Sequence, residues 1–299
     1  MKAAAFDYVR ADSLGQALQL LAERGDGARL LAGGQSLVPA LNLRLAAADL
    51  LVDISGLEGL RFIEPHGDGV RIGALTRHAD IARSAWLVER CPLLGAAIAH
   101  VAHPAIRNRG TFGGSLAQAD PAAELPACML ALDASIVAAG PSGERRIRAI
   151  DFFTGVYETA LRPGEVLTSV EIANLDEQRR FGFAELARRR GDFAIAGLAV
   201  AGDARNGALS GLRLAFFGVA DRPVLAPACA AALEGRAVTP TTLEAARAAL
   251  DDDLDPAGDA HATGPMRKRA RATCGWTRPT APCEPRIRRS FPAQAPRAN

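Results

Sequence analysis

The stretch Ala32-Gly33-Gly34-Gln35-Ser36 lies between a short apolar run and a helix-like segment, and Thr111-Phe112-Gly113-Gly114-Ser115 repeats that form later in the chain. Paired glycines let backbone N–H groups approach an anion because no Cβ stands in the way, and a following helix N-terminus adds a partial positive charge. One such loop is commonly only a turn. Two loops of matching form, each ending in a hydroxyl residue, predict a cradle for the pyrophosphate of a dinucleotide.

Length and composition bound the class of protein. The chain has 299 residues, of which 49% are hydrophobic, so it can form two or three compact units. No run reaches the roughly 18 apolar residues of a membrane span, and the first residues lack the apolar region of a secretory signal. We therefore expect a cytoplasmic protein without an integral membrane segment. The five cysteines are scattered, which predicts reduced thiols and no metal site.

The net charge of +2 is unevenly distributed along the chain. From Met266 onward nine Lys or Arg residues face only Glu284, which gives this tail +8 and leaves −6 on residues 1–265. The basic balance is therefore a property of the tail, and we expect no nucleic-acid partner for the body of the protein.

The periodicity of apolar residues predicts a mixed α+β arrangement. A capping box at Ser13-Leu14-Gly15-Gln16 opens an amphipathic helix that ends before Gly25, and Thr76 is expected to cap a helix through Ile81. Residues 174–180 are polar and read as a linker. The other predicted strands are 29–32, 50–54, 70–75, 135–139, 166–172, 181–186, 195–200 and 209–219, and the other predicted helices are 37–45, 92–101, 121–132, 227–233 and 241–250.

In the order and spacing of these motifs the chain resembles the FAD-binding medium subunits of molybdenum hydroxylases, which include aerobic carbon monoxide dehydrogenase and the flavin portion of xanthine dehydrogenase. The resemblance covers most of residues 1 to about 263. It rests on Phe6-Asp7-Tyr8, Leu31 to Leu37, Asp53-Ile54-Ser55, Ile72-Gly73-Ala74 with Thr76, Arg107 to Ser115, Asp120-Pro121-Ala122-Ala123-Glu124, Gly164 to Leu167, and Arg189 to Ala194.

The resemblance implies a fold and a set of cofactor-binding residues. The fold is a two-part FAD-binding domain of the vanillyl-alcohol-oxidase (PCMH) type, followed by a small C-terminal α/β layer domain. Glu124 falls at the acidic position on the ribose or adenine side, Leu167 at a position that packs on the adenine, and Phe193 in a loop near the flavin ring. The expected FAD-binding residues are Ala32, Gly33, Gly34, Gln35, Ser36, Leu37, Thr111, Phe112, Gly113, Gly114, Ser115, Asp120, Glu124, Leu167 and Phe193.

Several of these residues also have purely structural interpretations. Glu124 in the first turn of a helix would favour the helix dipole without a ligand, and Phe193 beside Ala194 and Ile195 fits core packing. Asp120 is better explained as a loop cap than as a catalytic acid. His100 and His103 lack a third ligand, so we expect no metal there.

The chain departs from the family pattern after Asp255 to Thr263. The family continues into a closing helix with a Tyr-Arg pair, whereas here an Arg- and Pro-rich tail follows, and we expect that helix to be missing and the tail disordered. Either the reading frame shifted near 264–271 or the tail docks on an acidic partner. The expected division is 1–57 and 58–176 for the two FAD-binding subdomains, 177–263 for the C-terminal domain and 264–299 for the tail.

The resemblance also implies a function. The chain would be an electron-transfer subunit that receives electrons from a small [2Fe-2S] subunit, which takes them from a large molybdenum-cofactor subunit, and passes them through FAD to an outer acceptor. The absence of a recognisable catalytic triad or metal-ligand set in the sequence agrees with such a relay, so no catalytic residue is assigned. A self-contained FAD oxidoreductase and a non-catalytic nucleotide-binding scaffold are the alternatives.

Overall fold

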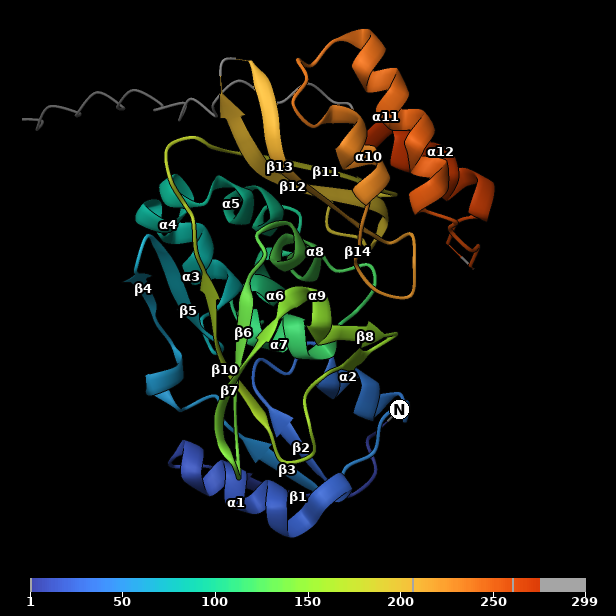
Figure 1. Ribbon diagram of the computed structural model, residues 1–299. Helices are drawn as coiled ribbons and strands as arrows, with labels where there is room; N and C mark the ends of the chain where they lie inside the picture. The colour runs from blue at the N-terminus through green and yellow to red at the C-terminus, as the bar shows by residue number, and fades with distance from the viewer. Residues whose placement is uncertain (1, 206, 260, 275–299) are drawn as a thin grey trace, which may run out of the picture.

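The computed structural model describes residues 2–205, 207–259 and 261–274. Three sheets follow one another along the chain, with helices packed between and around them (Figure 1). A short two-stranded ribbon, β8 (Phe153–Gly155) and β9 (Glu158–Thr159), lies beside them.

The N-terminal sheet is three-stranded and parallel, in the order β1-β3-β2. Its strands are β1 (Asp7–Arg10), β2 (Ala28–Leu31) and β3 (Leu50–Asp53). Helix α1 (Leu14–Arg24) packs on it through Ala17 and Leu21, and the hydroxyl of Ser13 accepts from the backbone N–H of Gln16 as the capping box predicts. Between β2 and β3 the chain forms the first glycine loop and α2 (Leu37–Asn42).

The central sheet is five-stranded and antiparallel, in the order β4-β5-β10-β6-β7. One of its faces packs on the helices that follow β5, so that α5 and α8 form the centre of the largest apolar core. The strands are β4 (Ile63–His66), β5 (Gly69–Gly73), β6 (Ser135–Gly140), β7 (Gly143–Arg148) and β10 (Val166–Ile172). The helices are α3 (His78–Arg83), α4 (Ala85–Arg90), α5 (Pro92–Ile98), α6 (Pro104–Arg107), α7 (Phe112–Gln118), α8 (Glu124–Ala131) and α9 (Ala149–Phe152).

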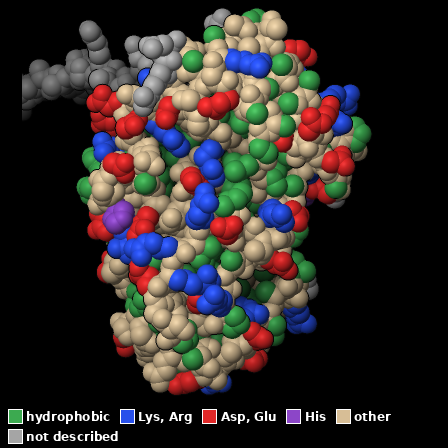
Figure 2. Space-filling view, viewed as in Figure 1, with side chains coloured by type: hydrophobic (Ala, Val, Ile, Leu, Met, Phe, Trp, Pro, Cys, Tyr) green, Lys and Arg blue, Asp and Glu red, His purple; other side chains and the backbone are tan. Residues whose placement is uncertain are grey.

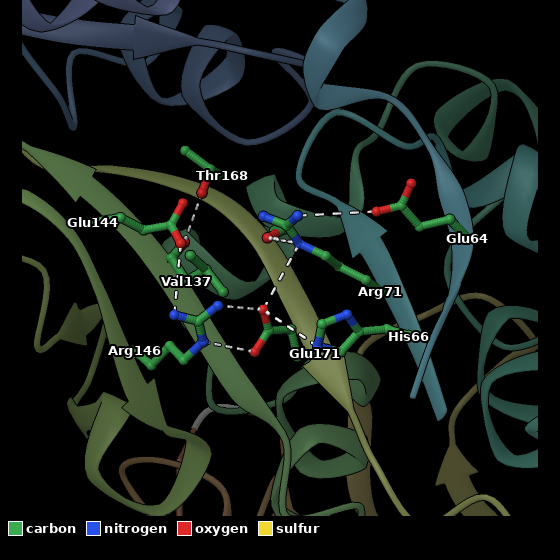
Figure 3. A network of polar contacts seen from close by, with 9 residues as sticks. Glu64, His66, Arg71, Val137, Glu144, Arg146, Thr168 and Glu171 are labelled. Atoms are coloured by element: carbon green, nitrogen blue, oxygen red, sulfur yellow. Dashed lines mark hydrogen bonds and ion pairs between the residues drawn. The ribbon is translucent and has the colours of Figure 1, made fainter. Parts of the chain in front are cut away.

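The other face of the central sheet carries a polar network (Figure 3). Glu171 on β10 lies at its centre and accepts two hydrogen bonds, each of 2.9 Å, from the guanidinium of Arg146. Arg71 on β5 lies 3.8 Å from the same carboxylate and also reaches Glu64 on β4. Arg146 is the largest cause of the lowered pKa of Glu171. The central sheet thus has one apolar face and one polar face.

The C-terminal sheet is apolar on both faces because helices cover both. It comprises β11 (Arg179–Ala187), β12 (Ala194–Arg205), β13 (Ala208–Phe217) and β14 (Val224–Leu225) in that order. Phe217 on β13 faces the core shared with α5 and α8, whereas its neighbour Phe216 faces α10 (Pro227–Leu233) and α11 (Pro240–Asp253). The sheet is therefore the middle layer of this half of the molecule (Figure 1).

A closing helix is present, which corrects the expectation that it is missing. Residues Gly264–Cys274 form α12, which packs against β12 and β11. The apolar periodicity is weak, but Arg267 is buried and finds polar partners on the sheet, so packing can fix the first turn without an apolar stripe. Residues 275–299, with Trp276 and Cys283, lie outside the described residues.

Three local expectations differ from the structure. Thr76 does not cap a helix, because its hydroxyl donates to the carbonyl of Phe62 at 2.8 Å and α3 begins only at His78. The helix expected from Pro121 begins at Glu124, since Asp120 caps a turn first. The second glycine stretch is not an open loop but the first turn of α7, with Thr111 as the N-cap.

On the face shown in Figure 2, acidic and basic side chains are interspersed, with hydrophobic side chains among them. Among the described residues, none of the helices is long and apolar enough to cross a membrane. Cys91, Cys128 and Cys229 are buried free thiols, as expected, while the side chains of Cys274 and Cys283 are not described.

Gly197 on β12 gives a test of this packing. A Cβ at Gly197 would lie 2.0 Å from Cζ of Phe217, whose ring is fully buried and cannot move freely. We expect Gly197→Ala to lower the free energy of unfolding by about 1–3 kcal/mol, measured by urea titration. Gly182→Ala on β11 is the control, because its Cβ would make an ordinary 3.6 Å contact with Val200. Equal stabilities for the two variants would contradict this packing.

Candidate functional site

The two glycine stretches meet at one end of the N-terminal sheet. Gly33 follows β2, and a Cβ on it would lie 2.4 Å from the carbonyl oxygen of Arg109 and 2.9 Å from Cα of Gly110. The backbone just before the second glycine stretch therefore packs directly on the first. Gly34 has φ +71, a conformation that favours glycine. Both glycines of the first loop are thus required by geometry, one for close approach and one for its backbone angle.

The two stretches differ in their backbone donors. In the second, the N–H of Phe112 donates to the carbonyl of Thr76 and that of Gly113 to Ala74, each at 2.8 Å, while Gly114 and Ser115 donate to Thr111. In the first, no hydrogen bond recorded among the described residues uses the N–H of Gly33, Gly34, Gln35 or Ser36. The expected pair of equal half-cradles is therefore unequal, because the first loop has four consecutive backbone N–H groups without a partner among the described residues, whereas those of Phe112 to Ser115 in the second are all used.

The loops border a cleft of about 560 Å³ between the N-terminal sheet, the central sheet and the start of β12. Every site residue expected from the sequence lines it except Phe112, whose ring is fully buried in the core beneath α7. Phe112 is thus a packing residue. Leu167 on β10 contributes to an apolar part of the wall, together with Leu30, Ile54, Leu75, Val101, Ile106, Leu161 and Val166.

An acidic corner of the cleft lies at the start of α8. Asp120 accepts from the N–H of Ala122 at 2.9 Å, which is the loop cap that the sequence predicts, and the hydroxyl of Tyr157 donates to its second oxygen at 3.3 Å. Burial is the largest cause that raises the pKa of Glu124, to about 8, and nearby Glu185 and Asp120 act in the same direction. Desolvation therefore outweighs the helix dipole that was expected to favour an ionised Glu124, and the carboxyl is largely protonated at neutral pH.

Glu185 and His100 stand behind this corner. The side chain of Glu185 is 2% exposed and its Oε2 lies 3.5 Å from Nδ1 of His100. Burial raises the pKa of Glu185 to about 7 and lowers that of His100. Burial thus shifts both groups toward their neutral forms.

His78 also lines the cleft, although nothing in the sequence singles it out, because it has no partner at a metal-ligand or catalytic spacing. Its Nε2 lies 3.0 Å from the carbonyl oxygen of Thr111, which requires a proton on that nitrogen. Burial lowers its pKa to about 4, so the ring is neutral and Nδ1 is an acceptor. Among the described residues Nδ1 has no hydrogen-bond partner.

Phe193 lies at the mouth of the cleft. Its side chain is 69% exposed, which rules out the core-packing interpretation of this residue. The preceding Gly191 has φ +88, and a Cβ there would lie 2.8 Å from the carbonyl oxygen of Ala102. The loop is therefore tightly seated at Gly191, while the phenyl ring two residues later is left free to contact a ligand.

Two sequence profiles together match nearly the whole described chain. One, described as the FAD binding domain in molybdopterin dehydrogenase, matches residues 4–174. The other, described as the CO dehydrogenase flavoprotein C-terminal domain, matches residues 181–274.

Individual proteins agree with these profiles. Subunit alpha of the 6-hydroxypseudooxynicotine dehydrogenase complex of Paenarthrobacter nicotinovorans is 48% identical over 199 residues, which are 67% of this chain and 67% of that protein. The carbon monoxide dehydrogenase medium chain of Hydrogenophaga pseudoflava is 35% identical over 281 residues, which cover 91% of this chain and 98% of that protein. A solved structure of the carbon monoxide dehydrogenase from that organism, lacking the Mo-pyranopterin moiety of the molybdenum cofactor, superposes with a TM-score of 0.89 at 36% identity. The match covers 92% of this chain and 96% of that one.

The contact at Gly33 leads to a prediction about ligand binding. Gly33→Ala must push the first loop away from Arg109 and Gly110, because both clashing atoms belong to the backbone. We expect the dissociation constant for FAD to rise by at least about tenfold, measured by titrating apoprotein with FAD and following flavin fluorescence. Gly59→Ala is the matched control, since a Cβ there meets nothing within 4 Å. Unchanged affinity in Gly33→Ala would contradict the loop contact.

Glu124 leads to a prediction about pH. Its pKa is about 8 in the folded protein against an ordinary value of 4.5, so between these pH values the native state holds a proton that the unfolded chain has released. The free energy of unfolding therefore falls as pH rises through this window, by at most about 1.4 kcal/mol per pH unit. Glu124→Gln should remove part of that fall and make the apoprotein more stable than wild type at pH 8.

Urea unfolding between pH 5 and 8.5 measures this difference. Glu89→Gln on the exposed side of α4 is the control and should follow the wild-type curve. Parallel curves for wild type and Glu124→Gln would show that Glu124 is ionised in the folded protein, contrary to the burial argument.

Proposed function

This chain belongs to the FAD-binding subunits of molybdenum hydroxylases, and from that membership we propose which of its residues bind FAD and how they do so. It is an FAD-dependent oxidoreductase subunit with an α+β fold, in which a PCMH-type FAD-binding domain precedes the C-terminal domain. Its role is electron transfer within a heteromeric enzyme that also contains a molybdenum-cofactor subunit and an iron–sulfur subunit.

One observation carries the assignment of the binding site. The backbone N–H groups of Gly33 to Ser36 have no partner among the described residues and border the cleft. We assign the pyrophosphate to this first loop. In the second stretch the backbone N–H groups of Phe112 to Ser115 are already used. We therefore assign to it only the hydroxyls of Thr111 and Ser115 and the wall against which the first loop is packed. Arg29, which is the lining residue with a permanent positive charge, adds electrostatic attraction for the phosphates.

The remaining contacts follow from the chemistry of the cleft wall. Bound FAD would accept electrons in its isoalloxazine ring and release them to an outer acceptor. Leu167 and its apolar neighbours offer a surface for the adenine, and protonated Glu124 can donate a hydrogen bond to a ribose oxygen. Phe193 stands at the exposed end, where its ring can cover the flavin.

No residue of the cleft is assigned a catalytic role in the oxidation of the organic substrate. Asp120 is occupied as a loop cap, and Glu165 accepts from Arg145 at 2.7 Å. The relatives are named after different substrates, 6-hydroxypseudooxynicotine and carbon monoxide, although they share this type of subunit. We therefore assign substrate recognition to the molybdenum subunit and electron transfer to this one.

The proposed domain division follows the three sheets. Residues 1–57 contain the N-terminal sheet, 58–176 the central sheet, and 177–263 the C-terminal sheet with α10 and α11. We assign the segment from 264 onward to the closing helix and the basic tail. A cytoplasmic location is proposed on the buried free thiols of Cys91, Cys128 and Cys229.

Purified full-length protein with added FAD tests the function directly. We expect flavin absorption bands that stay with the protein through gel filtration, and reduction of that flavin by the reduced iron–sulfur subunit but not by organic substrates alone. Direct reduction by a small alcohol or aldehyde would favour a self-contained oxidoreductase. Bound flavin that no donor reduces would favour a nucleotide-binding scaffold, and failure to take up FAD would contradict the assignment.

A further inference from the structure

Arg267 on α12 is a buried cation that the electron-transfer role does not use. The residue is 6% exposed, and its guanidinium donates to the carbonyl oxygens of Ile195, at 2.7 Å, and of Gly218, and to the carboxylate of Asp259. A buried guanidinium is costly unless its donors are paired, and here two backbone carbonyls and one carboxylate pair them. Each of those two carbonyls belongs to a segment next to the cleft.

The carbonyl of Ile195 lies at the base of the Phe193 loop. Gly191, Asp192 and Phe193 line the cleft, and β12 begins at Ala194, so Ile195 is the second residue of the strand that anchors this loop. A hydrogen bond at Ile195 therefore fixes the backbone only two residues from the exposed ring of Phe193.

The carbonyl of Gly218 lies behind the acidic corner. Gly218 follows the end of β13, and its N–H donates to the carbonyl oxygen of Pro121 at 2.8 Å. Pro121 stands between Asp120 and Glu124, both of which line the cleft. Through Gly218, Arg267 is thus linked to the second wall segment as well.

The space around Gly218 is closed to side chains. Its φ is +72, and a Cβ would lie 2.9 Å from the carbonyl oxygen of Ala194 and 3.1 Å from that of Ile195. The same guanidinium nitrogen of Arg267 donates to the carbonyl oxygens of Ile195 and Gly218, so these two oxygens lie close together. The cation between them relieves their mutual repulsion.

Asp259 orients this cation. Its carboxylate accepts from the N–H groups of His261 and Ala262 at 2.8 and 2.9 Å, so it is fixed before it meets Arg267. The bond from Arg267 is the largest cause that lowers the pKa of Asp259, to about 2. The pair is therefore charged at every pH at which the protein would be handled.

We propose that Arg267 is a positioning residue of the FAD site, which fixes the Phe193 loop and the Asp120–Glu124 segment from behind through Ile195 and Gly218. The closing helix is then part of the cofactor site although none of its described residues lines the cleft. This inference rests on the proposed function, because it concerns the geometry of the cleft to which FAD is assigned.

The test compares FAD binding and stability in full-length variants. We expect Arg267→Met to raise the FAD dissociation constant by about tenfold or more and to alter the visible circular dichroism of the bound flavin, which reports its surroundings. Arg267→Lys keeps a cation and should recover a large part of the affinity and the wild-type spectrum. Lys268→Met removes a neighbouring surface ion pair with Asp251 and should leave both unchanged.

A stability-matched variant separates positioning from general destabilisation. Leu250→Ala empties a buried site on α11, away from the cleft, and should lower the melting temperature without changing FAD affinity by more than about twofold. The proposal is overturned if Arg267→Met binds FAD like wild type, or if Leu250→Ala loses as much affinity as Arg267→Met. Wild-type protein that takes up no FAD would instead overturn the proposed function, and this inference with it.

Discussion

The backbone contact between Gly33 and the segment Arg109–Gly110 is the constraint on which the rest of the structure depends. It joins the loop after β2 of the N-terminal sheet to the segment between α6 and α7, at a point where even one methyl group would not fit. The second glycine stretch can act as a rigid wall there because its backbone donors are bonded to Thr76, Ala74 and Thr111. The first loop, held against that wall, keeps its own donors free. The second stretch is thus held by its own hydrogen bonds, while the backbone N–H groups of the first loop stay available for a ligand.

Burial of ionisable groups gives the cleft a second property. Glu124, Glu185 and His78 are all shifted toward their neutral forms by desolvation, with pKa values of about 8, 7 and 4. A carboxyl held in its protonated form repels the phosphates of a cofactor less than an ionised one would, and Glu124 is such a carboxyl in the cleft lining. Two cations have separate roles in this proposal. Arg29 lines the cleft and attracts the phosphates, whereas Arg267 lies behind the wall and supports the backbone at Ile195.

The C-terminal sheet connects these features. Because helices cover both of its faces, its strands bury alternate residues in two different cores, and Phe216 and Phe217 point to opposite sides. β12 and β13 are consequently held by packing against α8 on one side, and on the other by α12 against β12 and α10 against β13. β12 begins directly after the Phe193 loop of the cleft, and Gly218 after β13 donates to Pro121 beside the cleft, so the stability of this layer and the shape of the cleft are linked.

The sequence by itself determined the helix capped by Ser13, the two glycine stretches and the strands β2, β3, β5, β6 and β10 to β13, because local periodicity, capping and glycine pairs are properties of neighbouring residues. It did not indicate the shorter strands β1, β4, β7, β8, β9 and β14. The resemblance in the order and spacing of motifs also selected residues of the cleft, since all the expected residues except Phe112 line it, although they are fewer than half of its lining. Tertiary structure alone decided that Phe112 is core, that Phe193 is exposed, and that His78 belongs to the cleft, because burial depends on residues far away in the chain. It likewise decided that the closing helix forms, since the acceptors for Arg267 lie on strands about 50 to 70 residues earlier.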